Sequence, residues 1–335
     1  MTEANQAENI NAHHRARMRR KKGVEYDPQP GGSALIHVAA LYFALGATLV
    51  LCCAAANAEI RLIDDKGETV VLREPARRII SLAPHVTELL YAAGAGERIV
   101  GAVEYSNYPE AARQIPRVGN NQQLDLERIV TLKPDLIVVW LHGNAQRQLD
   151  KLTKLGIPVF YNEPRRLGDI ARSIEQLGQL AGTGTVAAQA ARAFAAREAE
   201  LRARYAGRAP VRVFYQIWQK PLMTVNGNHL ISDVIRLCGG QNVFADLKPL
   251  VPVVSTEAVL EADPEAIVTT IIDTKAQDGL DGWKKWPHLA AVARNNFFTI
   301  HTDLISRHAP SILEGAQQMC AHLDAARARG PKGRP

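Results

Sequence analysis

Histidines and a single serine come closest to a catalytic or metal-binding arrangement in this sequence. Ser81 lacks the flanking glycines of a nucleophile elbow. His85, His142, His301 and His308 are dispersed, and we interpret them as helix-capping or solvated side chains rather than axial metal ligands. The chain has no CxxC pair and no HExxH helix, which leaves a metal site without support. The sequence therefore offers no catalytic constellation that would indicate an enzyme.

The first 58 residues have the composition of an export signal. A basic run at 15–22 precedes an apolar stretch at 34–53, and small residues follow at Ala56 and Ala58. We predict cleavage after Ala58, so that the mature chain begins at Glu59 in the periplasm. An uncleaved membrane anchor is the alternative, because the apolar stretch is close to the roughly 20 residues that span a bilayer.

Two cysteines, Cys238 and Cys320, remain after that cleavage. An even count in an oxidising compartment predicts one disulfide bond between them. Closing a loop of roughly 80 residues stabilises a fold by about 4 to 5 kcal/mol in the chain-entropy model. Two separate buried thiols are the alternative that the sequence leaves open.

Length and composition indicate what kind of protein must position these residues. A chain of 335 residues with 47% hydrophobic and 22% charged residues is ordinary globular material for about two domains. The formal charge is +6, but the residues beyond 58 hold 34 Lys and Arg against 30 Asp and Glu. The remaining charge of +4 is too mild to indicate nucleic-acid binding.

Short β-branched runs alternate with helical stretches along the mature chain. In the first half, strands are predicted at 78–82, 99–103, 136–140 and 158–161, with helices at 86–93, 124–132 and 145–155. In the second half, strands are predicted at 211–217, 266–270 and 297–301, with helices at 230–237, 256–262 and 311–326. We therefore predict an α/β fold of two parallel-sheet lobes with a ligand cleft between them.

A single long helix is predicted to join the lobes. Residues 185–205 are rich in Ala, Arg and Glu and contain no Gly or Pro. The expected parts are a signal peptide (1–58), an N-terminal lobe (59–182), a bridging helix (183–207), a C-terminal lobe (208–328) and a disordered tail (329–335). A stiff bridge of this kind allows only a small hinge motion.

One local pattern occurs in both halves. Residues 126–130, followed by Pro134-Asp135, recur as residues 256–260, followed by Pro264-Glu265. Each copy predicts a short helix, a proline-acid pair that ends it (a Pro-acid stop) and a buried strand. Glu127 and Glu257 take equivalent positions in the two copies. Acids near a helix N-terminus stabilise it by a few tenths of a kcal/mol. Their equivalence raises a second interpretation, a pair of anionic contact points on one face.

The sequence resembles the helical-backbone (class III) periplasmic binding proteins of ABC importers, and among them the corrinoid-binding members. The resemblance covers residues 77–325. It rests on RIISLAP at 78–84, TEL at 87–89, YSNYP at 105–109, LERIV at 126–130, LKPDL at 132–136, Trp140, residues 143–145 with 147–148, CGG at 238–240 with Asn242 and Phe244, AP at 309–310, AQQ at 316–318, and Cys320.

This resemblance implies a monomeric protein that captures cobalamin, as a transported ligand and not as a cofactor, and delivers it to an inner-membrane ABC permease. Tyr105 and Trp140 match aromatic residues that line the corrinoid cleft. Met223 replaces a further aromatic, and Trp218 lies near it. A corrin is a broad disc fringed with amides, so aromatic and polarizable side chains suit its faces. A loop of the second lobe would touch the ligand through Asp303, Leu304, Ile305, Ser306 and Arg307.

The resemblance also implies that Glu127 and Glu257 each meet a basic pocket on one permease subunit. A binder of ferric siderophore, haem or another metal chelate is the alternative within the same fold. A membrane-anchored extracytoplasmic enzyme is the alternative from a different class, although the sequence offers it no catalytic constellation.

Overall fold

A computed structural model describes residues 59–143, 146–271 and 279–330. The predicted signal peptide and the end of the predicted tail lie outside the described residues. Within these ranges, no helix combines the length and the apolar character needed to cross a membrane.

The N-terminal lobe is built on a parallel sheet of four strands in the order β4-β3-β5-β6. The strands are β3 (Ile79–Ser81), β4 (Ile99–Ala102), β5 (Leu136–Trp140) and β6 (Val159–Asn162). The associated helices are α2 (Pro84–Ala92), α3 (Leu126–Thr131), α4 (Gln146–Lys154) and α5 (Leu167–Leu180), with 3-10 turns at Gly96–Arg98 and Glu110–Gln114. Helices cover the sheet, so the continuous apolar run of β5 is buried along Leu136–Val139. A hairpin of β1 (Ile60–Ile63) and β2 (Thr69–Leu72) precedes this lobe and was not predicted.

The C-terminal lobe repeats this architecture with the strand order β8-β7-β9-β10. The strands are β7 (Val211–Gln216), β8 (Gly240–Asn242), β9 (Ala266–Ile271) and β10 (Phe297–His301). The associated helices are α7 (Leu230–Leu237), α8 (Thr256–Ala262), α9 (Ala290–Ala293), α10 (Thr302–Ile305) and α11 (Ile312–Ala328), with a 3-10 turn at Asp281–Lys285. In each lobe the second strand in the chain forms one edge and the first strand lies beside it, so the two lobes share one topology.

The internal repeat extends to individual residues. Gly94 and Gly239 follow α2 and α7 with φ of 77° and 72°, a left-handed conformation that glycine adopts without strain. Asp135 accepts a hydrogen bond from the Arg78 amide, and Glu265 accepts one from the Arg212 amide, at 2.9 and 3.0 Å. The two Pro-acid stops therefore join equivalent strands in both lobes.

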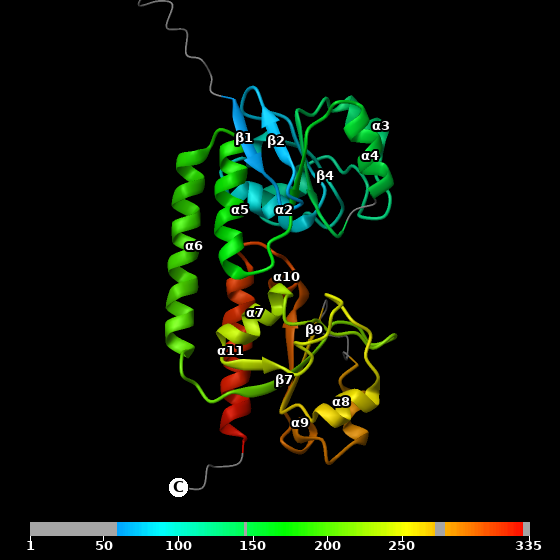
Figure 1. Cartoon of the computed structure of the whole chain (residues 1–335), viewed down its shortest axis with the longest axis vertical. Helices are drawn as coiled ribbons and strands as arrows, with labels where there is room; N and C mark the ends of the chain where they lie inside the picture. The colour runs from blue at the N-terminus through cyan, green and yellow to red at the C-terminus, as the bar shows by residue number, and fades with distance from the viewer. Residues whose placement is uncertain (1–58, 144–145, 272–278, 331–335) are drawn as a thin grey trace, which may run out of the picture. The chain divides into compact units, whose positions relative to one another are not determined.

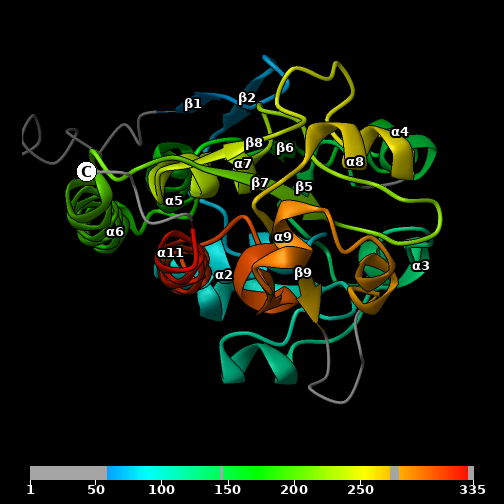
Figure 2. The same ribbon diagram turned by 90° about the horizontal axis from the view of Figure 1, so that it is seen from below.

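A helix of 22 residues, α6 (Gly184–Tyr205), connects the lobes. It runs alongside α5 and also contacts α11, as both views show (Figures 1 and 2). Gly178 of α5 permits this close packing, because a Cβ at that position would lie 2.1 Å from the Ala187 Cβ. The predicted helix over 185–205 agrees with α6 within one residue at its start.

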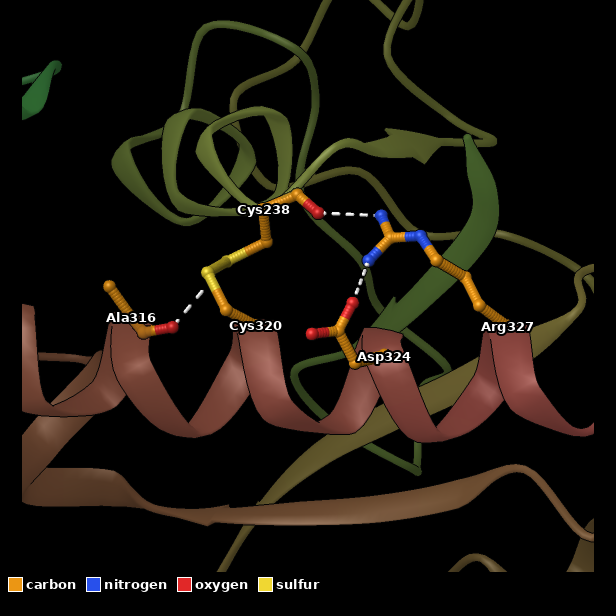
Figure 3. The surroundings of a disulfide bond; sticks show 5 residues. All are labelled: Cys238, Ala316, Cys320, Asp324 and Arg327. Carbon is orange, nitrogen blue, oxygen red and sulfur yellow. Dashed lines mark hydrogen bonds and ion pairs between the residues drawn. A yellow bond between two sulfur atoms is a disulfide. The ribbon is translucent and has the colours of Figure 1, made fainter. Parts of the chain in front are cut away.

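A disulfide bond joins Cys238, directly after α7, to Cys320 within α11 (Figure 3). Both cysteines are fully buried. The Arg327 guanidinium donates hydrogen bonds to the Cys238 carbonyl and to Asp324, each at 2.7 Å. The predicted bridge is confirmed, and the alternative of two separate thiols is wrong. The bond ties the last helix to the C-terminal lobe.

Candidate functional site

The candidate site lies where the carboxyl ends of the two sheets come together. In the N-terminal lobe β5 ends at Trp140, and in the C-terminal lobe β10 ends at His301 and leads into α10. The Trp140 ring lies 5.9 Å from the ring of His308, measured between centroids, which joins these two regions. Ligands of parallel α/β sheets bind at this edge, because loops there can vary without disturbing the sheet.

Four rings form an interlobe aromatic cluster, which consists of His85, Trp140, His229 and His308. His85 lies 5.5 Å from Trp140 and 5.6 Å from His308, and His229 lies 5.6 Å from His308. His85 is in the first turn of α2, and the His229 Nδ1 caps α7 by accepting a hydrogen bond from the Ile231 amide. The cluster therefore packs the start of one helix from each lobe against the loop after α10.

Burial keeps the three histidines neutral. Each is at most 8% exposed. Burial lowers the pKa of His229 to about 3 and that of His308 to about 4, although a hydrogen bond with the Pro164 backbone acts in the opposite direction on His308. The pKa of His85 lies well below its usual value, first because of burial and then because of His308 and Arg307.

The prediction of capping or solvated histidines is wrong for His85 and His308. The local sequence Ala-Pro-His resembles an ordinary helix start, but the other lobe covers the ring. The prediction is correct for His301, whose Nδ1 accepts a hydrogen bond from the Asp303 amide at the start of α10. His142 has a half-exposed side chain and lies 3.1 Å from Glu163.

Tyr105 is an exposed aromatic residue held by a strained backbone. It follows β4, is 72% exposed and has a φ of 64°. A left-handed conformation costs a residue with a Cβ about 1 kcal/mol or more, and such residues gather at functional sites. The next residue, Ser106, is fully buried, and its amide donates to the Val103 carbonyl. The turn therefore holds the backbone of Tyr105 at the surface.

Trp218 lies on a short antiparallel turn after β7. It pairs with Met223, which pairs in turn with Val253. Trp218 is 62% exposed, Val253 is 63% exposed, and Met223 is partly buried. The Trp218 Nε1 donates to the Lys220 carbonyl at 3.0 Å, which holds the indole on its own turn. Val253 extends this apolar surface and was missed, since no local pattern distinguishes it from a core valine.

The predicted loop contacts at 303–307 fall on α10 and the two residues after it. Asp303 is exposed and forms an ion pair with Arg307 at 2.9 Å, and Ser306 is exposed. Leu304 is partly buried against the core. Ile305 is fully buried in the core, so its side chain is a packing residue. The helical period therefore divides this segment into a solvent face and a core face.

Glu127 and Glu257 occupy equivalent positions at the second residue of α3 and α8. Each helix begins with a side-chain cap: Asp125 accepts from the Arg128 amide, and Ser255 accepts from the Ala258 amide. Both glutamates are exposed. Hydrogen bonds from its own backbone and from Ser255 lower the pKa of Glu257.

Trp283 and Trp286 pack locally against the core of the C-terminal lobe. Trp283 is 4% exposed, contacts Phe214 and Trp286, and donates from its Nε1 to Gln216 at 2.8 Å. Beside them, a cavity of about 200 Å³ continues from the Trp218 turn and is lined in part by Gln219 and Lys220. A larger cavity of about 680 Å³ lies between β2 and β6, and its lining contains none of the predicted ligand residues.

The part of the chain that the structure describes contains no group of three His, Cys, Asp or Glu side chains suited to a metal ion. The interlobe aromatic cluster thus offers ring faces and neutral nitrogens rather than a ligand set for a metal.

Comparison with known proteins assigns most of this chain to one family. The family model described as "Periplasmic binding protein" matches residues 79–304. The vitamin B12-binding protein of Vibrio cholerae serotype O1 is 41% identical over 250 residues, which cover 74% of this chain and 90% of that protein. The vitamin B12-binding protein of Vibrio parahaemolyticus is 39% identical over 252 residues, with 75% and 90% covered.

Solved structures give the same result. The crystal structure of the periplasmic vitamin B12 binding protein BtuF of Vibrio cholerae matches with a TM-score of 0.69 and 40% identity, covering 76% of this chain and 98% of that one. The periplasmic heme-binding protein RhuT from Roseiflexus sp. RS-1 matches with a TM-score of 0.66 and 23% identity, covering 75% and 99%. At that identity the second likeness concerns the fold alone.

Proposed function

Because this chain belongs to the periplasmic binding protein family, we propose that it captures a corrinoid, cobalamin, and delivers it to an inner-membrane ABC permease. One observation carries the proposal: identity of 41% over 90% of the length of a vitamin B12-binding protein. Resemblance at this level extends through both lobes and therefore includes the edges at which a ligand binds.

The proposed ligand surface combines exposed aromatic rings with a few polar groups. Tyr105 and Trp218 supply flat faces, because the fold leaves both rings in solvent. Met223 adds polarizable area, and Trp140 contributes to the floor where the lobes meet. Such surfaces suit a corrin disc, whose amide fringe needs only a few hydrogen-bonding groups.

Polar contacts come in this proposal from Asp303, Ser306 and Arg307. The ion pair between Asp303 and Arg307 orients both side chains before a ligand arrives. Leu304 contributes at most an edge contact, and Ile305 supports α10 from the core. The ligand is bound and released unchanged in this proposal.

The remaining parts of the proposal concern export and delivery. The leader is cleaved after Ala58, residues 59–182 and 208–328 form the two lobes around the bridging helix 183–207, and the mature protein acts as a periplasmic monomer. Glu127 and Glu257 dock the protein on the permease. Their equivalent, exposed positions support this role, because a pair of acids suits a transporter with two equivalent subunits.

Isothermal titration calorimetry on the mature protein tests the ligand. We expect saturable binding of cyanocobalamin with one site per chain, and no comparable binding of haemin or of a ferric hydroxamate. Binding of either iron chelate without binding of cyanocobalamin would assign the protein to the alternative ligand class and overturn the proposal.

A further inference from the structure

A buried carboxylate on the first helix of the N-terminal lobe binds the start of the last helix of the C-terminal lobe. Glu88, on α2, accepts a hydrogen bond from the Ser311 amide at 2.7 Å and another from the Ser311 hydroxyl at 3.0 Å. Glu88 is 3% exposed. Ser311 is the N-cap of α11, and its own side chain does not cap the helix.

A second buried carboxylate makes the opposite connection. Asp233, on α7, accepts a hydrogen bond from the Leu167 amide at 2.9 Å, and Leu167 is the first residue of α5. Asp233 is 7% exposed, and its other oxygen accepts from Arg236 on its own helix at 3.1 Å. Here the C-terminal lobe supplies the acid and the N-terminal lobe supplies the helix.

These two connections are equivalent under the internal repeat. Aligning Gly94 with Gly239, the residues that end α2 and α7, places Glu88 opposite Asp233. The helices α5 and α11 also correspond, since α5 is the first helix after the fourth strand of its lobe and α11 follows the fourth strand of the other lobe after the single turn of α10. Each lobe thus caps the last helix of the other lobe with the same position of its first helix.

We propose that this reciprocal pair of carboxylate caps fixes the angle between the lobes in the absence of ligand. Helix N-termini present amides without partners inside the helix, and a carboxylate satisfies them while facing the positive end of the helix dipole. Rotating the lobes apart would break these three interlobe hydrogen bonds: Glu88 would lose both of its donors, and Asp233 would keep only Arg236. Such a loss is costly for a buried carboxylate. Two such points, on different helices, restrain rotation more than either one alone.

A fixed angle matters because it prepares the ligand surface in advance. Tyr105 and Trp140 belong to one lobe, and Trp218 belongs to the other. If the lobes were correctly aligned only a tenth of the time, the apparent affinity would fall about tenfold. The caps therefore act as positioning residues, and no direct contact with ligand is assigned to them.

Pulsed dipolar electron paramagnetic resonance on the ligand-free mature protein tests the arrangement of the lobes, because it measures the distance distribution between a spin label on each lobe. Spin labels attach at Val130→Cys on α3 and Glu261→Cys on α8, which are exposed positions in different lobes, while Cys238 and Cys320 are bonded to each other. We expect one narrow distance distribution for the parent chain. We expect a broader or displaced distribution for the Glu88→Ala, Asp233→Ala double variant, and a smaller change for each single variant.

Two matched controls separate alignment from general loosening. Asp169→Asn removes a carboxylate that accepts from the Arg165 and Arg166 amides at the start of α5, within one lobe. Glu314→Gln removes an exposed acid from the first turn of α11. Both controls should keep the narrow distribution, even if Asp169→Asn lowers the melting temperature. If the alanine pair does not fold, Glu88→Gln with Asp233→Asn keeps the side-chain volume and replaces it.

An unchanged distribution in the double variant would overturn the proposal, and so would equal broadening in the controls. The readout needs no ligand. A parent chain with a narrow distribution that bound no corrinoid would reject the proposed function and leave the caps standing.

Discussion

At the scale of single residues, the clearest functional signal is the exposure of large aromatic rings. Tyr105 is 72% exposed and Trp218 is 62% exposed, whereas Trp140 is partly buried in the interlobe aromatic cluster. Replacing an exposed ring would remove a proposed ligand contact but would remove little from the core. We therefore expect Ala substitutions at the two exposed positions to affect ligand affinity alone, and the substitution of Trp140 to affect both affinity and stability.

We expect Tyr105→Ala and Trp218→Ala each to weaken cyanocobalamin binding by about 1 to 3 kcal/mol, the usual scale for aromatic anchors. The free energy of unfolding should stay nearly unchanged. Trp140→Ala should weaken binding and also lower the stability by roughly 1 to 3 kcal/mol, because its ring packs between the lobes. Calorimetry and urea unfolding on the same samples check both quantities. Unaltered affinity in the Tyr105 and Trp218 variants would remove these rings from the ligand surface.

The buried histidines predict a pH dependence of stability. In the folded chain, burial sets the pKa of His308 at about 4 and that of His229 at about 3, while an unfolded histidine titrates near 6.5. The stability that these neutral, buried histidines allow is fully present above about pH 6.5. The free energy of unfolding decreases as the pH falls below that value, since only the unfolded chain then takes up the protons. Each such histidine adds a slope of about 1.4 kcal/mol per pH unit. Burial raises the pKa of Glu88, which offsets part of the loss.

Urea unfolding between pH 7.5 and 4.5 measures this slope. His308→Gln should reduce this slope by about 1.4 kcal/mol per pH unit, the amount expected for one buried histidine. His288→Gln, at an exposed position, should leave the slope unchanged. A slope that is the same in all three proteins would mean that His308 is not excluded from protonation in the fold.

The residue scale also shows where sequence-based prediction stops. The Pro-acid stops and the acids Glu127 and Glu257 could be placed because their local pattern occurs twice. The contacts of His85 with His308, and of Glu88 with Ser311, could not be predicted, because each joins residues more than 200 positions apart through the docking of two lobes. No local pattern carries that information.

At the scale of elements, the prediction matched the buried central strands and the long Ala-rich helix, and it missed several other elements. The buried strands β5 and β9 and the helix α6 match their predicted ranges closely. The hairpin of β1 and β2 was missed, since its strands have four residues each and one partly exposed face. The strand β8 and the helix α5 were also missed. The packing of α5 against α6 means that the bridge is not a lone rod.

The disulfide is the element-scale feature with the largest expected effect. We expect the Cys238→Ser, Cys320→Ser double variant to be less stable by about 4 to 5 kcal/mol, because the bond closes a long loop. The separation is 82 residues. Urea unfolding with and without a reducing agent checks this, and the agent should shift the midpoint of the parent chain but not that of the variant. Equal midpoints for the parent under both conditions would contradict the bridge in the protein as isolated.

At the scale of the whole molecule, the proposed delivery to a permease would use exposed residues that lie outside the proposed ligand surface. We expect the Glu127→Ala, Glu257→Ala double variant to bind cyanocobalamin normally and to fail to bind the permease in detergent. Single exposed ion pairs contribute less than about 1 kcal/mol, but removing both contact points also slows association. Pull-down of purified permease checks the prediction. Glu261→Ala, at another exposed acid of α8, is the matched control, and retained binding by the double variant would make both glutamates ordinary helix-end residues.

The shared strand order has a consequence for how the chain reaches its final form. In the described residues, each parallel sheet is completed by consecutive strands, within 79–162 for one lobe and within 211–301 for the other. Either lobe can therefore finish its own strand pairing without the other. The entropic cost of closing loops stays moderate, because the paired strands of each sheet are not far apart in the sequence. Contacts that join the lobes, including the ring cluster and the two caps, can form only after both sheets exist. We expect them to form last and to open first, and hydrogen exchange should then reach their amides well before it reaches the strands.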